Sequence, residues 1–197
     1  MDSGISTSDI TKNKENKMSD FDTCKIEAIK IDTRRAYNMP DEHSVDADFR
    51  AGKNSADIDI GDDAREWIVK CSEKIASGAR HIRIKLIPDD GPDEYQMAAH
   101  LVYHPRQAKV GIRTLYLLRS DFVQIVASLG FGDWQPNDFW LFDLNSGIEQ
   151  FYNPDYTYSH ATDMDEEAVA RYVALRNAVL SSDKLFDMEE FDKRYLK

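Results

Sequence analysis

Hydrophobic and polar residues along the chain follow the period of strands in some segments and that of helices in others. Residues 79–87 alternate strictly, with apolar side chains at positions 82, 84 and 86 and basic side chains at 81, 83 and 85. This pattern predicts a strand with one basic face, which Pro88 ends. Two further strands are predicted over residues 24–37 and 110–117.

Apolar residues spaced three and four apart predict helices between these strands. The clearest of these helices has Asp62 or Asp63 as its predicted N-cap. It carries Trp67 on its apolar face and ends before Gly78. The other predicted helices cover residues 44–49, residues 92–104, residues 120–129 with Ser120 as the cap, and a last stretch that starts at Thr162 or Asp163 as the cap and ends at Ser181.

Residues 138–143 read Asp-Phe-Trp-Leu-Phe-Asp, four large apolar side chains between two aspartates. A turn at residues 145–147 follows, and residues 148–152 complete a predicted β-hairpin. A continuous apolar run indicates a strand that is covered on both faces. Trp67, Phe139, Trp140 and Phe142 are therefore predicted to lie in the core.

The order of these elements predicts an α/β fold, a single domain with a mixed, mostly parallel sheet, helices on both faces and a C-terminal β-hairpin. The domain is expected to cover residues 21–182. Residues 1–20 contain two isoleucines among polar residues and are predicted to form a disordered arm. Met18 is a candidate for the true start. Residues 183–197 are predicted to form an acidic tail with a short helix.

Charge and cysteine content narrow the classes of function. The chain has 25 lysines and arginines against 36 aspartates and glutamates, a net charge of −11, which argues against general nucleic-acid binding. Cys24 and Cys71 are too few for a disulfide framework or a cysteine metal site. No apolar run approaches the ~18 residues of a membrane span. A cytoplasmic protein without membrane association, cofactor or metal is expected.

Basic residues gather in one part of this acidic chain. Residues 80–119 hold seven lysines and arginines against four acids, a local charge of +3. Arginines on strands can hold a phosphate or carboxylate through paired hydrogen bonds, and ligands of open α/β sheets bind beyond the carboxyl ends of the strands. The alternative is that these arginines pair with the chain's own carboxylates. The candidate ligand-binding residues are Arg83, Arg113, Arg119, Asp89, Asp138 and Asp143.

Two histidine patterns come near to known chemistry. His81, Arg83 and Asp89 approximate the phospholipase D motif, in which a lysine takes the place of Arg83 and the aspartate comes one residue earlier. His100 and His104 have the spacing of metal ligands on a helix, but no third ligand is in register. We therefore assign no catalytic residue and no metal ligand, and we expect a structural or surface histidine pair.

Several short motifs together resemble an uncharacterised actinobacterial domain family of unknown function, which is often encoded beside helix-turn-helix regulators. The resemblance covers about residues 24 to 180. In layout the family is similar to one half of a phospholipase D-like enzyme that lacks the catalytic histidine and lysine. The motifs are residues 31–37, Phe49 with Gly52, Trp67, Gly78 with residues 82–84, Tyr95, Ile112-Arg113 and, most specifically, residues 138–143.

The resemblance and the missing catalytic set favour a non-enzymatic cytosolic binding or regulatory module that acts with a protein partner and binds, at most, a small anionic ligand. One alternative is a phosphodiester-cleaving or nucleotide-processing enzyme that uses His81, Arg83 and Lys85. Another is a DNA-associated transcriptional regulator, which the negative charge disfavours.

Overall fold

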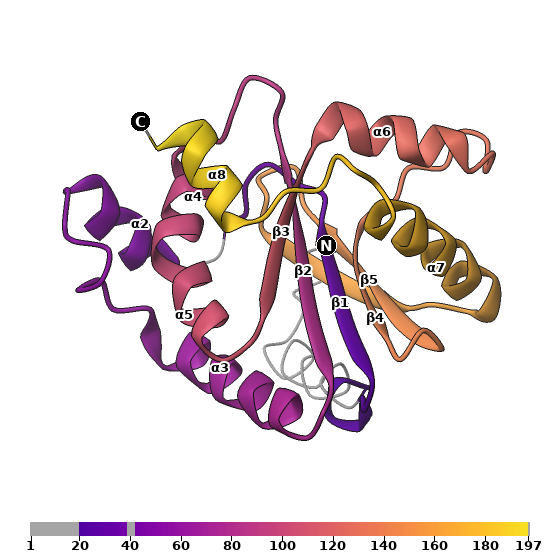
Figure 1. Ribbon diagram of the computed structural model, residues 1–197, viewed down its shortest axis with the longest axis horizontal. Helices are drawn as coiled ribbons and strands as arrows, with labels where there is room; N and C mark the ends of the chain where they lie inside the picture. The colour runs from indigo at the N-terminus through magenta and orange to yellow at the C-terminus, as the bar shows by residue number, and fades with distance from the viewer. Residues whose placement is uncertain (1–19, 39–41, 197) are drawn as a thin grey trace, which may run out of the picture.

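The computed structural model describes residues 20–38 and 42–196, so nearly all of the predicted N-terminal arm lies outside the described residues. A six-stranded sheet in the order β3-β2-β1-β4-β5-β6 runs through the described part of the chain, with helices on both of its faces (Figure 1). The strands are β1 (Glu27–Asp32), β2 (Arg80–Ile87), β3 (Arg113–Leu118), β4 (Asp138–Phe142), β5 (Ser146–Tyr152) and β6 (Tyr158–Asp163).

In the first half of the chain the helices alternate with the strands, and two more helices follow the last strand in the described part of the chain. A helical turn over residues 20–23 precedes β1. None of the described helices has the length and apolar character needed to cross a lipid bilayer. The helices are α2 (His43–Arg50), α3 (Gly61–Ala76), α4 (Glu94–Ala98), the π-helical η2 (Ala99–Tyr103), α5 (His104–Lys109), α6 (Arg119–Ser128), α7 (Glu166–Leu180) and α8 (Met188–Tyr195).

The sheet is mixed, which confirms the predicted α/β class. β1, β2 and β3 pair in parallel, with helices in the connections between them, whereas β4 pairs antiparallel with β1 and is followed by the antiparallel β5 and β6. The antiparallel part is larger than expected because the sequence analysis missed β6. That strand carries mostly exposed polar residues, so it lacks the apolar alternation that identified the others.

One face of the sheet carries the main hydrophobic core, beneath α6 and α7. It contains Ile82, Ile84 and Leu86 of β2, the apolar half of the predicted alternation. Leu175 and Val179 of α7 are fully buried against it. At the edge of this layer the buried Glu27 of β1 pairs with Arg176 of α7 and Arg80 of β2. Lys30, Asp32, Arg83 and Lys85 alternate with the core residues of β1 and β2 and project from the opposite face.

The opposite face is covered by α3, by the α4–η2–α5 segment and by α8 (Figure 1). Trp140 projects from β4 on this side and packs on Phe21, Trp67 and Phe142. Phe139 and Phe142 are buried as predicted, but Trp140 is only partly buried, because this face has a lighter cover near β4. Trp67 is likewise partly buried.

Several predicted helix boundaries were wrong. α7 has Asp165 as its N-cap, whereas the predicted caps Thr162 and Asp163 belong to β6. α3 begins at Gly61 with Ile60 as its N-cap, so Asp62 and Asp63 lie in the first turn and do not cap it. The helix that was expected to stop before Pro105 continues through it, because the π-helical turn η2 allows the chain to proceed where proline lacks an N–H group. α6 starts at Arg119, and its predicted cap Ser120 instead donates a hydrogen bond to Asp89.

The C-terminal segment forms the predicted short helix and packs on the domain. Phe186 and Tyr116 exchange two backbone hydrogen bonds, of 2.8 and 3.0 Å, which cover part of the edge strand β3. Phe191 of α8 is fully buried and stacks on His100. Residues 186–195 are thus part of the second helical layer.

Replacement of Phe139 by alanine should reveal how strongly the sheet depends on the main core. The ring is fully buried and lies 4.3 Å from the Tyr172 ring. Its loss should lower the free energy of unfolding by ~3–5 kcal/mol, measured by urea titration. Val123→Ala is a matched control, because Val123 is 53% exposed on α6. A Phe139 variant as stable as that control would contradict the assigned core.

Candidate functional site

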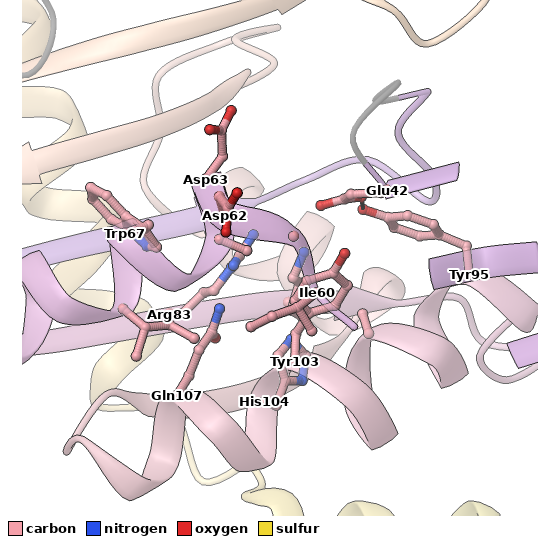
Figure 2. A pocket seen from close by; sticks show the side chains of 15 residues that line it. Glu42, Ile60, Asp62, Asp63, Trp67, Arg83, Tyr95, Tyr103, His104 and Gln107 are labelled. Atoms are coloured by element: carbon pink, nitrogen blue, oxygen red, sulfur yellow. Dashed lines mark hydrogen bonds between the residues drawn. The ribbon is translucent and has the colours of Figure 1, made fainter. Parts of the chain in front are cut away.

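A cavity of about 450 Å³ lies over the second face of the sheet. Its floor is β2, one wall is the start of α3, and the other wall is the α4–η2–α5 segment (Figure 2). The residues that line it are Glu42, Ile60, Gly61, Asp62, Asp63, Ala64, Trp67, Ile68, Arg83, Lys85, Tyr95, Ala99, Tyr103, His104 and Gln107.

Four charged side chains from two neighbouring strands meet at this face of the sheet, and two of them, Arg83 and Lys85, line the cavity. Parallel pairing places Lys30 of β1 beside Arg83 of β2, and Asp32 beside Lys85. The Asp32 carboxylate, which has no exposed surface, lies 2.8 Å from Lys30 Nζ, 2.7 Å from Arg83 Nε and 2.9 Å from Lys85 Nζ. Three cations therefore surround one carboxylate, and two positive charges are in excess at full ionisation.

The mutual influence of these groups appears in their pKa values. Burial alone would raise the pKa of Asp32, but Arg83, Lys30 and Lys85 hold it well below its usual range. Burial and then the Arg83 charge lower the pKa of Lys85 to about 8, although the Asp32 charge acts to raise it. Burial would also lower the pKa of Arg83, but its ion pair with Asp32 raises it. Asp32 and Arg83 are thus ionised at neutral pH, and Lys85 is close to its titration point.

Arg83 has hydrogen-bonding capacity to spare. It binds Asp32 through Nε, and its two terminal nitrogens have no hydrogen-bond partner among the described residues. Its side chain is 22% exposed and lines the cavity. A guanidinium held by one nitrogen can still present its outer edge to a phosphate or carboxylate.

The first turn of α3 also lines the cavity. Its N-cap is Ile60, whose side chain cannot accept a hydrogen bond, and Gly61 turns the chain into the helix with φ +78°. The first N–H groups of a helix have no partner within it and carry a partial positive charge. These N–H groups can donate to an anion, while the Asp62 and Asp63 carboxylates of the same turn line the cavity as well and offset part of its positive charge.

Polar acceptors face the cavity from the opposite wall. Gln107 of α5 is 5% exposed, and its Oε1 has no hydrogen-bond partner in the described part of the chain. Figure 2 shows its side chain directed from α5 toward Arg83. The Tyr95 hydroxyl donates to Glu42 Oε2 at 2.7 Å, which holds that carboxylate at the rim. A buried amide without a partner is costly, so a ligand at this place would satisfy it.

His81 lies on the same face of β2 as Arg83 and Lys85 but does not line the cavity. It is 5% exposed, with the rings of Trp67, Trp140 and Phe21 5.5–5.9 Å away. Burial, followed by the charges of Arg83 and Lys30, lowers its pKa to about 3. A substrate phosphorus could not reach the imidazole, which counts against catalysis by this histidine.

Among the six candidate ligand residues, the structure places Arg83 in the cavity. Asp138 is fully buried and accepts hydrogen bonds from Thr33 N, Thr33 Oγ1 and the Tyr37 hydroxyl. Asp143 accepts from the backbone N–H groups of residues 25, 26 and 27 and from Cys24 Sγ, at 2.7–3.2 Å. These backbone bonds outweigh burial and lower the pKa of Asp143 to about 2. Both carboxylates hold the chain on either side of β1.

The remaining three candidates lie away from the cavity. Arg113 is exposed at the start of β3. Arg119 donates to the Thr33 carbonyl, and Asp89 accepts from Ser120 Oγ on the loop after β2. The cavity itself lies over the middle of the sheet face and does not lie at the carboxyl ends of the strands.

The two histidines are buried and meet at one tyrosine hydroxyl. Nδ1 of His100 and Nδ1 of His104 both lie within hydrogen-bond distance of the Tyr116 hydroxyl, at 2.6 and 2.7 Å. Within the described residues, no group of three or more histidines, cysteines or carboxylates could hold a metal ion.

The sequence analysis missed Lys30, Asp32 and Gln107 as site residues. Lys30 and Asp32 alternate with Ile29 and Ile31, so the signal was a strand with one charged face, the same pattern that identified β2. Their pairing with β2 could not be found without the register. Gln107 follows Pro105, where the predicted helix had already ended.

Comparison with known proteins identifies the family but no characterised relative. Residues 16–185 match a domain of unknown function (DUF6879), and because the match covers most of the chain, the protein belongs to that family. No curated protein and no solved structure gives a significant match.

Replacement of Asp32 by asparagine should destabilise the protein by ~3–5 kcal/mol at pH 7, because it leaves buried cations without their partner. Folding lowers the Asp32 pKa, so its contribution is complete above the ordinary aspartate value of about 3.9 and is lost as the pH falls through the lower folded value. Urea titrations should therefore show the gap between variant and wild type narrowing below about pH 4. Asp62→Asn, at a side chain that is 96% exposed, serves as the control. Equal stability of the Asp32 variant and wild type at pH 7 would contradict this account.

Proposed function

We propose that the protein is a non-enzymatic binding module that takes a small anionic ligand in the cavity above β2. The observation that carries the proposal is the excess of buried positive charge. Lys30, Arg83 and Lys85 share the single carboxylate of Asp32, and Arg83 keeps two nitrogens for a further partner. An anion in the cavity would compensate that excess, and the start of α3 would add N–H donors.

The cavity has the size and chemistry of a small-molecule site. Its volume of about 450 Å³ falls within the ~300–1,000 Å³ that is usual for such sites. Trp67 and Ile68 give it apolar walls, and Arg83, Lys85 and Gln107 give it a few convergent polar groups. This combination of apolar walls with few polar groups is typical of ligand pockets.

A phosphodiester-cleaving enzyme is the weaker candidate. Such an enzyme would need His81 as its nucleophile beside the phosphate-holding Arg83 and Lys85. His81 is buried beneath aromatic rings, whereas Arg83 and Lys85 face the cavity. The arrangement therefore favours holding an anion over attacking it.

The cytoplasmic, regulatory role with a protein partner is also a proposal. It rests on the helix-turn-helix regulators that often accompany the family which the sequence resembles. A ligand-binding module that reports to a regulator would fit that arrangement. Co-purification with the neighbouring regulator from the host, with and without phosphate, tests the association. A regulator that never co-purifies in either condition would contradict it.

Calorimetry with inorganic phosphate and with sulfate, against chloride at constant ionic strength, tests the anion site. Wild type should bind both oxyanions, and Arg83→Met should weaken the binding about 10- to 100-fold, because hydrogen bonds to charged groups contribute ~1.5–3 kcal/mol. Arg113→Met is the matched control, because Arg113 is exposed and lies outside the cavity. Binding that is absent in wild type, or equal in the two variants, would contradict the proposal.

The pH dependence of sulfate binding tests the part of Lys85. Sulfate keeps its charge across this range, whereas Lys85 has a pKa of about 8 and loses its proton as the pH rises. The affinity for sulfate should therefore fall between pH 7 and pH 9. In Lys85→Met it should be lower at pH 7 and nearly constant over the same range. Wild-type affinity that does not change with pH would exclude Lys85 from the site.

A further inference from the structure

A buried hydrogen-bonded chain leads from the surface of α8 to the cavity. The Asp192 carboxylate, whose side chain is 54% exposed, lies 2.6 Å from Nε2 of His100. Nδ1 of His100 lies 2.6 Å from the Tyr116 hydroxyl, which lies 2.7 Å from Nδ1 of His104. His104 is 2% exposed and lines the cavity. We call these four residues the Asp192–His104 chain.

Donor and acceptor rules, applied to neutral histidine rings, give a direction to every hydrogen bond in this chain. An ionised carboxylate only accepts, so Nε2 of His100 carries a proton. Burial lowers the pKa of His100 in spite of Asp192, so the ring is neutral and its Nδ1 is an acceptor. The Tyr116 hydroxyl must then give its single proton to His100.

The last bond of the chain follows from the others. With the Tyr116 proton already committed, the Tyr116 oxygen can only accept, so Nδ1 of His104 is the donor. Burial, and next the charge of Lys85, lower the pKa of His104 well below its usual range, so this ring too is neutral. Its Nε2 is consequently an unprotonated acceptor. Within the described residues, Nε2 of His104 has no hydrogen-bond partner.

The cavity thus presents two opposed kinds of group. Arg83, Lys85 and the start of α3 attract an anion on one side. On the other, Nε2 of His104, the unpartnered amide oxygen of Gln107 and the Glu42 carboxylate all accept hydrogen bonds. His104 and Gln107 are three residues apart on α5, so they share one side of that helix. A simple anion would leave these acceptors unsatisfied.

We propose that the ligand is a phosphate monoester that carries hydroxyl groups, with its phosphate at Arg83 and its hydroxyls donating to His104 and Gln107. This inference rests on the proposed anion site and specifies its ligand. Sugar phosphates and nucleoside monophosphates share this chemistry, and a cavity of about 450 Å³ is large enough for either. His104 and Gln107 contact the ligand, whereas Asp192, His100 and Tyr116 are positioning residues that keep Nε2 of His104 free of a proton.

Two phosphate esters of the same length separate this inference from the proposed function. Glycerol 1-phosphate and propyl phosphate differ in their hydroxyl groups alone, and both can be measured by calorimetry at pH 7 on the full chain. The glycerol ester should bind about 10-fold tighter or more, as expected for polar groups that are left unpaired by the analogue. Equal affinities would overturn the inference and leave the anion site standing. Failure of both esters and of inorganic phosphate would overturn both proposals.

Ribose 5-phosphate and adenosine 5′-monophosphate then distinguish the two sources of the ligand. Each should bind at least as tightly as glycerol 1-phosphate, and the tighter of the two identifies the source. If both bind more weakly than propyl phosphate, the inference is wrong.

Tyr116→Phe tests the role of the Asp192–His104 chain, because it keeps the ring and removes the hydroxyl that fixes the tautomer. Nitrogen-15 spectra of the histidine side chains should show His104 protonated on Nδ1 in wild type, and on Nε2 in a large fraction of the variant molecules. The affinity ratio of glycerol ester to propyl ester should fall toward one. Tyr156→Phe, at an exposed tyrosine, should keep both the spectrum and the ratio. A Tyr116→Phe variant that keeps the wild-type ratio, or a wild type with His104 protonated on Nε2, would overturn the inference.

Discussion

The carboxylate of Asp32, buried in contact with three cations, is the constraint on which the second face of the sheet depends. Lys30, Arg83 and Lys85 could not be covered by helices without it, because unpaired buried charge is expensive. One carboxylate does not neutralise three cations, however, and the helices leave a cavity at this point. The same charges therefore hold two strands side by side and make the floor of a binding site.

The two aspartates of residues 138–143, which the sequence analysis named as candidate ligand residues, hold the chain at the two ends of β1. Asp143 accepts from the N–H groups of the two residues before β1 and of its first residue, and Asp138 accepts from Thr33 directly after β1. The aromatic residues between them fill both faces of β4. Because carboxylates at the two ends of β4 fasten the two ends of β1, the most specific part of the sequence is explained by architecture and not by ligand binding.

Local patterns predicted the fold better than they predicted the site. Alternation located β2, and helical spacing located α3 and α7, because those signals depend on neighbours in the sequence. The sequence placed Arg83 in a candidate site but could not tell that Lys30 and Asp32 lie beside it, since this depends on strand register. Gln107 and His104 reach the cavity through a π-helical turn, which has no apolar period to reveal it. Asp138 and Asp143 were expected to act as ligand residues or internal partners of arginine, and instead they bind the polypeptide backbone and neighbouring side chains.

The pairing of β1 with β4 determines when this domain can assemble during protein synthesis. β1 lies at the centre of the sheet, yet its antiparallel neighbour and the Asp143 carboxylate follow more than a hundred residues later, as the separation of 117 residues between Ile26 and Asp143 shows. A nascent chain that has left the ribosome through β3 can form the parallel half of the sheet, but β1 then has an open, apolar edge. An exposed strand edge of this kind can pair with other chains. The incomplete sheet of β1, β2 and β3 is therefore the intermediate that a ribosome-associated chaperone would need to protect from aggregation.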